Sequence, residues 1–238
     1  MTEHELTTLL EDALRAQVTS RCKRAYGHDL KNGLQALYGG IDVLIRAAQN
    51  PQSMRTPVER VIDHVRQAIA RHQETLDHVL EHLIPEPRQE HTLSIVACIQ
   101  DVVTFLRNDA AHNSVTFRVD LSDEPVVDAC PARLRLAFLA LLLDAIDASP
   151  AGGEVQLQGE VTEGRFRLVI SGDRVQVAES DIDAAASRSV LLPAYQNILL
   201  PVTRRIVLEE GGEFDAVEDV QTARRVMVSF PVSTASRS

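Results

Sequence analysis

Apolar residues recur at three- and four-residue spacing through the first 83 residues of the chain. The first run of them is Leu6, Leu9, Leu10, Ala13, Leu14 and Val18, and the second is Leu30, Leu34, Leu37, Ile41, Leu44 and Ile45. This spacing predicts one face of a single long helix, loosened at Gly27. Asn50-Pro51 ends that helix, and a further periodic stretch from Val58 to Leu83 predicts a second one.

Two long helices joined by a short turn make an antiparallel hairpin. A lone hairpin of this kind cannot bury both of its apolar faces. A second copy of the chain would cover what is left, so we expect a homodimer held together by a four-helix bundle. Packing of the same faces on the second domain of a monomer is the alternative.

The pattern changes after a linker marked by Pro85 and Pro87. Helical patterns are found at 93–113, 131–149 and 190–212, and strand patterns at 115–122, 126–129, 152–162, 164–173, 213–219 and 224–232. The predicted fold class is α+β: the hairpin, then an α/β sandwich of mostly antiparallel strands with helices on one face. We expect domains at 1–86 and 90–232, and a disordered tail at 233–238.

Composition narrows the possible functions. The net charge of −10 argues against nucleic acid as a partner, because phosphate neutralisation needs a basic face. No apolar run approaches the ~20 residues of a membrane span, and the N-terminus lacks a signal-peptide pattern. Cys22, Cys98 and Cys130 form no CxxC pair, so we expect reduced thiols and a cytoplasmic location.

The candidate chemistry lies in the stretch HDLKN of the first helix, which contains His28, Asp29 and Asn32. A neutral imidazole nitrogen is a competent phosphoryl acceptor, and Asp29 next to it is a candidate general base. Asn32 lies one helical turn after His28 on the same face. If Leu30 faces the bundle, His28 lies roughly 200° away and points outward.

The simpler interpretation is that His28 is an ordinary surface residue, as most lone helical histidines are. The other histidines of the hairpin region lack the acid and amide neighbours; they are His64, His72, His78, His82 and His91. The i, i+4 pair of His78 and His82 supplies only two metal ligands, so we expect no metal site there.

The order of these features resembles the dimerisation and catalytic core of bacterial two-component histidine kinases, over residues from about 20 to about 231. The resemblance implies that His28 carries the phosphoryl group and that the following domain has the ATP-binding fold. In that family an acid, two residues and then Asn or Thr mark the ability to dephosphorylate a partner. Asp29 to Asn32 match this pattern, with the amide orienting the attacking water.

The nucleotide-binding motifs of that family are degraded here. The Mg²⁺-binding Asn is replaced by Asp144 in LLLDAIDAS, and the adenine-binding Asp by Ser171 in VISGD. Asn197 and Leu199, in YQNILLPV, stand where the family has glycines. Glycines let backbone N–H groups approach phosphates, so their loss argues against ATP binding, although Asp144 would still suit Mg²⁺.

We therefore expect a histidine-kinase-like phosphotransferase that has no tightly bound cofactor. His28 would take a phosphoryl group from one response regulator receiver domain and give it to another, or dephosphorylate such a domain, with Mg²⁺ supplied by the receiver. Two alternatives stay open. One is a divergent but active ATP-dependent histidine kinase, and the other is a dimeric scaffold without enzymatic activity that binds a response regulator.

Overall fold

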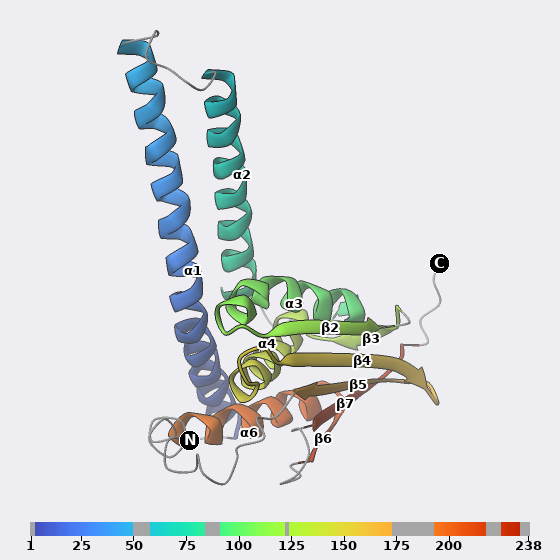
Figure 1. Ribbon diagram of the computed structural model, residues 1–238. Coiled ribbons are helices and arrows are strands. Elements are labelled where there is room, and N and C mark those ends of the chain that lie inside the picture. The colour runs from blue at the N-terminus through green and yellow to red at the C-terminus, as the bar shows by residue number, and fades with distance from the viewer. Residues whose placement is uncertain are drawn as a thin grey trace. The chain divides into compact units, whose positions relative to one another are not determined.

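The computed structural model of the protein describes residues 3–49, 58–83, 91–121, 124–172, 193–217 and 225–233 (Figure 1). The chain divides into two compact units. Residues 20–84 form the first, which we call the hairpin unit. Residues 1–19 and 85–238 form the second, which we call the α/β unit.

The hairpin unit is built from two neighbouring antiparallel helices, α1 (Glu3–Gln49) and α2 (Val58–Leu83). The two predicted helices are confirmed, and α1 stays helical through Gly27, where we expected it to loosen. After Tyr26, one row of α1 residues is less exposed than the rest of the helix. These residues follow one another at alternating spacings of three and four: Leu30, Gly33, Leu37, Gly40, Leu44 and Ala47. This row is the seam between α1 and α2.

Two glycines bring the helices close together along this seam. A Cβ atom on Gly40 would lie 2.4 Å from Cγ2 of Val65 on α2. A Cβ atom on Gly33 would lie 2.7 Å from Nδ1 of His72. Both distances are too short for real atoms, so the α2 side chains occupy the space that larger α1 residues would need.

A second apolar row lies beside the seam and is exposed within one chain. Leu34 and Ile41, which we expected to face the bundle, are each 45% exposed. Helix α1 also exposes Tyr38 and Ile45. Helix α2 exposes Val58, Ile69 and Leu76. The hairpin therefore buries only one of its two apolar faces, as the sequence predicts.

The α/β unit contains a five-stranded sheet in the order β2-β4-β5-β7-β6. The strands are β2 (Thr116–Leu121), β4 (Glu154–Thr162), β5 (Arg165–Gly172), β6 (Glu213–Val217) and β7 (Arg225–Pro231). Strand β2 pairs with β4 in parallel, and the other neighbours pair antiparallel. The predicted mostly antiparallel sheet, and the closing β6–β7 hairpin, are confirmed.

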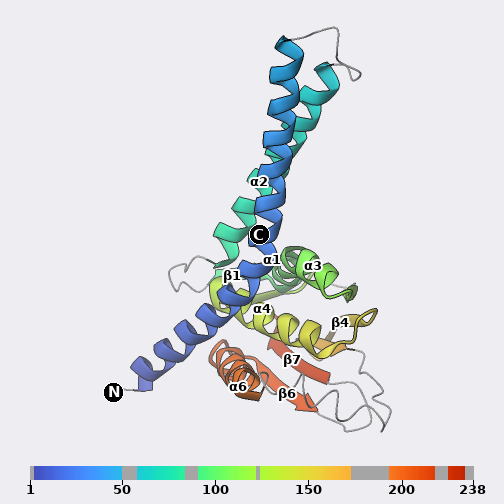
Figure 2. The same cartoon turned by 60° about the vertical axis from the view of Figure 1, so that its left-hand side comes forward.

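Helices α3 (Ile95–His112), α4 (Pro131–Ala148) and α6 (Pro193–Glu209) supply the other layer. Figure 2 shows α4 and α6 side by side along the sheet. Alternate residues of the central strands are buried, such as Phe166, Leu168 and Ile170 of β5. Phe138 of α4 meets Phe230 of β7 edge to face, with ring centroids 6.5 Å apart.

Strand β1 (His91–Ser94) was missed by the sequence analysis, which assigned residues from 93 onward to a helix. It pairs antiparallel with β3 (Val126–Ala129) in a separate two-stranded sheet. The helix starts later because Ser94 is its N-cap, and its hydroxyl accepts a hydrogen bond from the backbone N–H of Ala97 at 3.2 Å.

The first turns of α1 belong to the α/β unit, although we expected residues 1–86 to form one domain. The buried residues of this segment are Thr7, Glu11, Leu14 and Val18. Leu6 and Leu9, which the spacing assigned to the buried face, are 39% and 58% exposed. Apolar spacing therefore misplaced this face, because two of the residues that it buries are polar.

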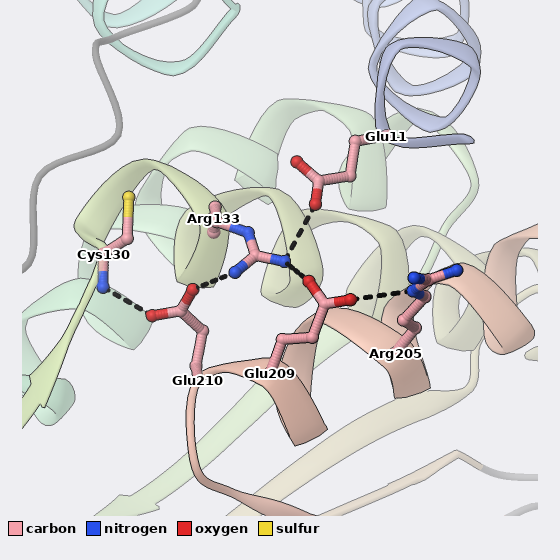
Figure 3. Close-up of polar contacts among 6 residues, drawn as sticks. All are labelled: Glu11, Cys130, Arg133, Arg205, Glu209 and Glu210. Carbon is pink, nitrogen blue, oxygen red and sulfur yellow. Dashed lines mark hydrogen bonds and ion pairs between the residues drawn. The ribbon is translucent and has the colours of Figure 1, made fainter. Parts of the chain in front are cut away.

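Glu11 is buried because it has a partner in α4 (Figure 3). Its carboxylate accepts a hydrogen bond from the guanidinium of Arg133 at 2.8 Å. The same guanidinium also donates to the carboxylates of Glu209 and Glu210, at and just beyond the end of α6. One buried cation thus joins three segments of the α/β unit.

The C-terminal end is fixed as far as Ser233, whose backbone N–H donates to the carbonyl of Val126 at 2.7 Å. The rest of the expected tail, 234–238, lies outside the described residues, as does the linker at 84–90. Among the helices that the structure describes, none is long and apolar enough to cross a membrane.

The seam predicts opposite effects for two adjacent glycines of α1. A Cβ atom on Gly39 meets nothing within 4 Å, whereas one on Gly40 meets Val65. Gly39→Ala should therefore stabilise the hairpin by about 0.5–1 kcal/mol through helix propensity. Gly40→Ala should lose that gain and cost about 1–3 kcal/mol through overpacking. Urea unfolding followed by circular dichroism checks this, and an equal gain for both variants would contradict the close seam.

Candidate functional site

The histidine motif lies on α1 within the hairpin unit. Residues 28, 29 and 32 are all helical, so positions 28 and 32 share one face, one turn apart. Asn32 is exposed, and so is Lys31 next to it. The placement of the His28 and Asp29 side chains lies outside what the structure describes.

The seam fixes where position 28 lies on the helix. Counting 100° per residue, position 28 is roughly 140° from Gly33 and roughly 200° from Leu30. Position 32 lies roughly 100° from Gly33 and roughly 200° from Leu30. Both positions therefore lie on the side of α1 away from α2.

The degraded nucleotide motifs lie in the α/β unit. Asp144, in the last turns of α4, is only 5% exposed. A carboxylate at that exposure has little access to a hydrated Mg²⁺ ion, which keeps several of its waters when proteins bind it. The geometry therefore weakens the case for a magnesium site at Asp144.

The end of β5 is pressed against the end of α4 in the same unit. A Cβ atom on Gly172 would lie 2.8 Å from Oγ of Ser149 and 3.5 Å from the carbonyl oxygen of Ala145. The Ser149 hydroxyl donates to that same carbonyl at 2.8 Å. Ser171 precedes this contact and is half-buried. The structure thus brings the two predicted motif regions, around Asp144 and Ser171, together.

The two positions that lack glycine, Asn197 and Leu199, both lie inside α6. A backbone N–H in the interior of a helix donates to the carbonyl four residues earlier, so it is not available to a phosphate. A flexible glycine-rich loop offers such groups, whereas the N–H groups of positions 197 and 199 are used within the helix. The side chains of these two residues lie outside the described set.

Known structures match this arrangement of elements. Full-length ShkA in complex with AMPPNP aligns with a TM-score of 0.51 and 16% identity, over 98% of this chain and 46% of ShkA. This chain has the histidine kinase core fold. It spans about half the length of ShkA, and at that identity the match shows the fold alone. No protein-family model matches the sequence, and no curated protein matches it either.

Two further alignments to histidine kinases have TM-scores below 0.5 and carry no argument. The Acinetobacter baumannii histidine kinase AdeS aligns with a TM-score of 0.48 and 15% identity, over 87% of this chain and 98% of AdeS. Histidine kinase ThkA in complex with response regulator protein TrrA aligns at 0.47 and 16%, over 98% of this chain and 68% of that one.

Ser149 is the residue near the expected nucleotide motifs that the sequence analysis missed. Nothing in the sequence links it to Gly172, because the two meet only when β5 packs on α4. No group of three or more His, Cys, Asp or Glu side chains that could hold a metal occurs among the described residues. Burial raises the pKa of the Cys98 thiol to about 12, which makes it a poor nucleophile.

The contact between Gly172 and Ser149 generates a double-mutant prediction for the histidine kinase fold. Gly172→Ala should destabilise the α/β unit by about 1–3 kcal/mol, because its methyl group overlaps the Ser149 hydroxyl. In a Ser149→Ala background the same change should cost much less, since the overlapping oxygen is gone. Thermal unfolding of the four proteins measures this coupling. If the effects of the two substitutions on stability simply added, the end of β5 and the end of α4 would not be in contact.

Proposed function

We propose that this chain is a histidine phosphotransfer protein of two-component signalling that keeps the histidine kinase core fold without using ATP. His28 would receive a phosphoryl group from the aspartate of one receiver domain and pass it to another. The observation that carries this proposal is the helical state of positions 197 and 199, where the family has a glycine-rich loop. The intact motif on the outer side of α1 supplies the chemistry that is left.

The transfer step uses groups that the motif contains. The lone pair of one imidazole nitrogen of His28 attacks the phosphorus of the receiver's aspartyl phosphate. The new N–P bond forms as the P–O bond breaks, and the aspartate leaves as a carboxylate. The imidazole then carries a positive charge until Asp29 takes the proton of its other nitrogen. The receiver's own Mg²⁺ would balance the phosphoryl charge, so this chain needs no metal of its own.

Asn32 supports a second reaction, the removal of the phosphoryl group from a receiver domain by hydrolysis. Its amide is exposed one helical turn from position 28, on the same face. An amide there is placed to orient a water molecule toward the receiver's phosphoryl group, which would make this chain a response regulator phosphatase. The same docked complex would serve both reactions.

A homodimer is part of the proposal. The exposed row of Leu34, Tyr38, Ile41 and Ile45 continues along α1 beside the seam, and α2 exposes three further apolar residues. A contiguous apolar surface of this kind favours burial against a second copy. The bundle would leave position 32 open to a receiver domain, because it lies roughly 160° from Leu34 and roughly 180° from Ile41 around α1.

The test is transfer from phosphorylated receiver domains. Each receiver domain encoded in the source genome is loaded with acetyl phosphate, freed of the donor and mixed with this chain. We expect at least one receiver to lose its phosphoryl group and the chain to gain an acid-labile label. His28→Ala should abolish the label. His64→Ala, which changes an exposed histidine of α2, should leave it unchanged.

The outcomes separate the alternatives. Asn32→Ala should preserve labelling of His28 but slow the release of inorganic phosphate from the receiver. Receiver binding that survives His28→Ala, with no transfer in the unchanged protein, would support the scaffold instead. A label that persists in His28→Ala would place the acceptor elsewhere and contradict the proposal.

A further inference from the structure

The first turns of α1, residues 3–19, pack on the α/β unit through one narrow face. We call these residues the docked segment. Four of its residues are buried, and they are Thr7, Glu11, Leu14 and Val18. Glu11 is the charged one of the four, and it is 4% exposed. A carboxylate at that depth needs a partner, which Arg133 provides at 2.8 Å.

Arg133 has two further carboxylate partners besides Glu11. Arg133 is 8% exposed. Figure 3 shows its guanidinium between the carboxylates of Glu11, Glu209 and Glu210. Burial alone would lower the pKa of Arg133, but these carboxylates outweigh that effect and raise it. Two of the three come from the C-terminal end of the α6 region, so Arg133 would remain paired if Glu11 were removed.

The other two carboxylates are also held by further groups. Glu210 accepts a second hydrogen bond, from the backbone N–H of Cys130 at 2.7 Å. Glu209 accepts one from Nε of Arg205 at 2.8 Å. Burial would raise the pKa of Glu209, yet the hydrogen bonds from Arg205 and Arg133 lower it. These hydrogen bonds join α4 to the end of α6 without any contribution from the docked segment.

Leu6 and Leu9, on the outer side of the docked segment, are exposed, so that side buries little surface within the described part of the chain. The end of a helix frays unless tertiary packing holds it, because short helical stretches are marginal in water. Glu11 is the buried charged residue that ties the docked segment to α4.

We propose that the Glu11–Arg133 pair is a latch that holds residues 3–19 on the α/β unit and opens without unfolding that unit. With the latch open, residues 3–19 would no longer be packed on the α/β unit, while α4 and the end of α6 would stay joined through Arg133.

Hydrogen–deuterium exchange of the full chain tests the latch. The variant is Glu11→Ala, and its matched control is Asp12→Ala, which removes an exposed acid from the same turn. Alanine is the best helix former, so neither change weakens the helix itself. We expect backbone exchange in residues 5–16 to rise about tenfold or more in Glu11→Ala, the effect of losing one charged hydrogen bond. Exchange in α4 and α6 should stay unchanged, and Asp12→Ala should match the original protein.

Two results would overturn the latch. Equal exchange in Glu11→Ala and Asp12→Ala would show that Glu11 does not hold the segment. A parallel rise in α4 and α6 would show that Glu11 stabilises the whole α/β unit and is not a separable contact. Leu14→Ala removes a fully buried side chain from the same face, so it shows the exchange of an undocked segment. The experiment needs no receiver domain, so its outcome is independent of the proposed phosphotransfer.

Discussion

Helix α1 serves two separate cores with two different faces. Its first turns bury Thr7, Glu11, Leu14 and Val18 in the α/β unit. Further along, the seam that begins at Leu30 packs on α2, with Gly33 and Gly40 allowing close approach. The helix is continuous through both stretches, so the positions of its seam residues also fix which positions face away. Positions 28 and 32 owe their place on the outer side of α1 to this constraint.

The proposed loss of ATP use rests on local features of the α/β unit. Phosphate binding by a backbone depends on N–H groups that are not already bonded, and on residues small enough to let a phosphate approach. In this chain a helix occupies positions 197 and 199, and Asp144 is buried in α4. The α/β unit is nevertheless well packed, with a continuous sheet and an aromatic contact between α4 and β7. Folding and nucleotide binding make separate demands on the sequence, and the substitutions that remove one can spare the other.

Much of the fold could be predicted from the sequence, because period and turn residues are local signals. The hairpin, the helices and all but one of the strands of the α/β unit follow from them. The docked face of α1 could not be predicted in this way. Glu11 reads as a solvent-exposed residue until Arg133, 122 positions later, is placed beside it. Gly33 and Gly40 read as weak helix residues, because their role depends on His72 and Val65 of the other helix. The contact between Gly172 and Ser149 was hidden for the same reason. That His28 points outward stays a prediction from the helical period.

The central claim is that this histidine kinase fold works without ATP, and calorimetric titration with ATP–Mg²⁺ tests it most directly. The protein must be concentrated enough to reveal sub-millimolar affinity. The account predicts no saturable heat of binding, because positions 197 and 199 are helical where the family has glycines, and Ser171 lacks the carboxylate that would accept from adenine. Stoichiometric binding would contradict it. The chain would then be a divergent kinase, expected to transfer the γ-phosphoryl group of ATP to His28.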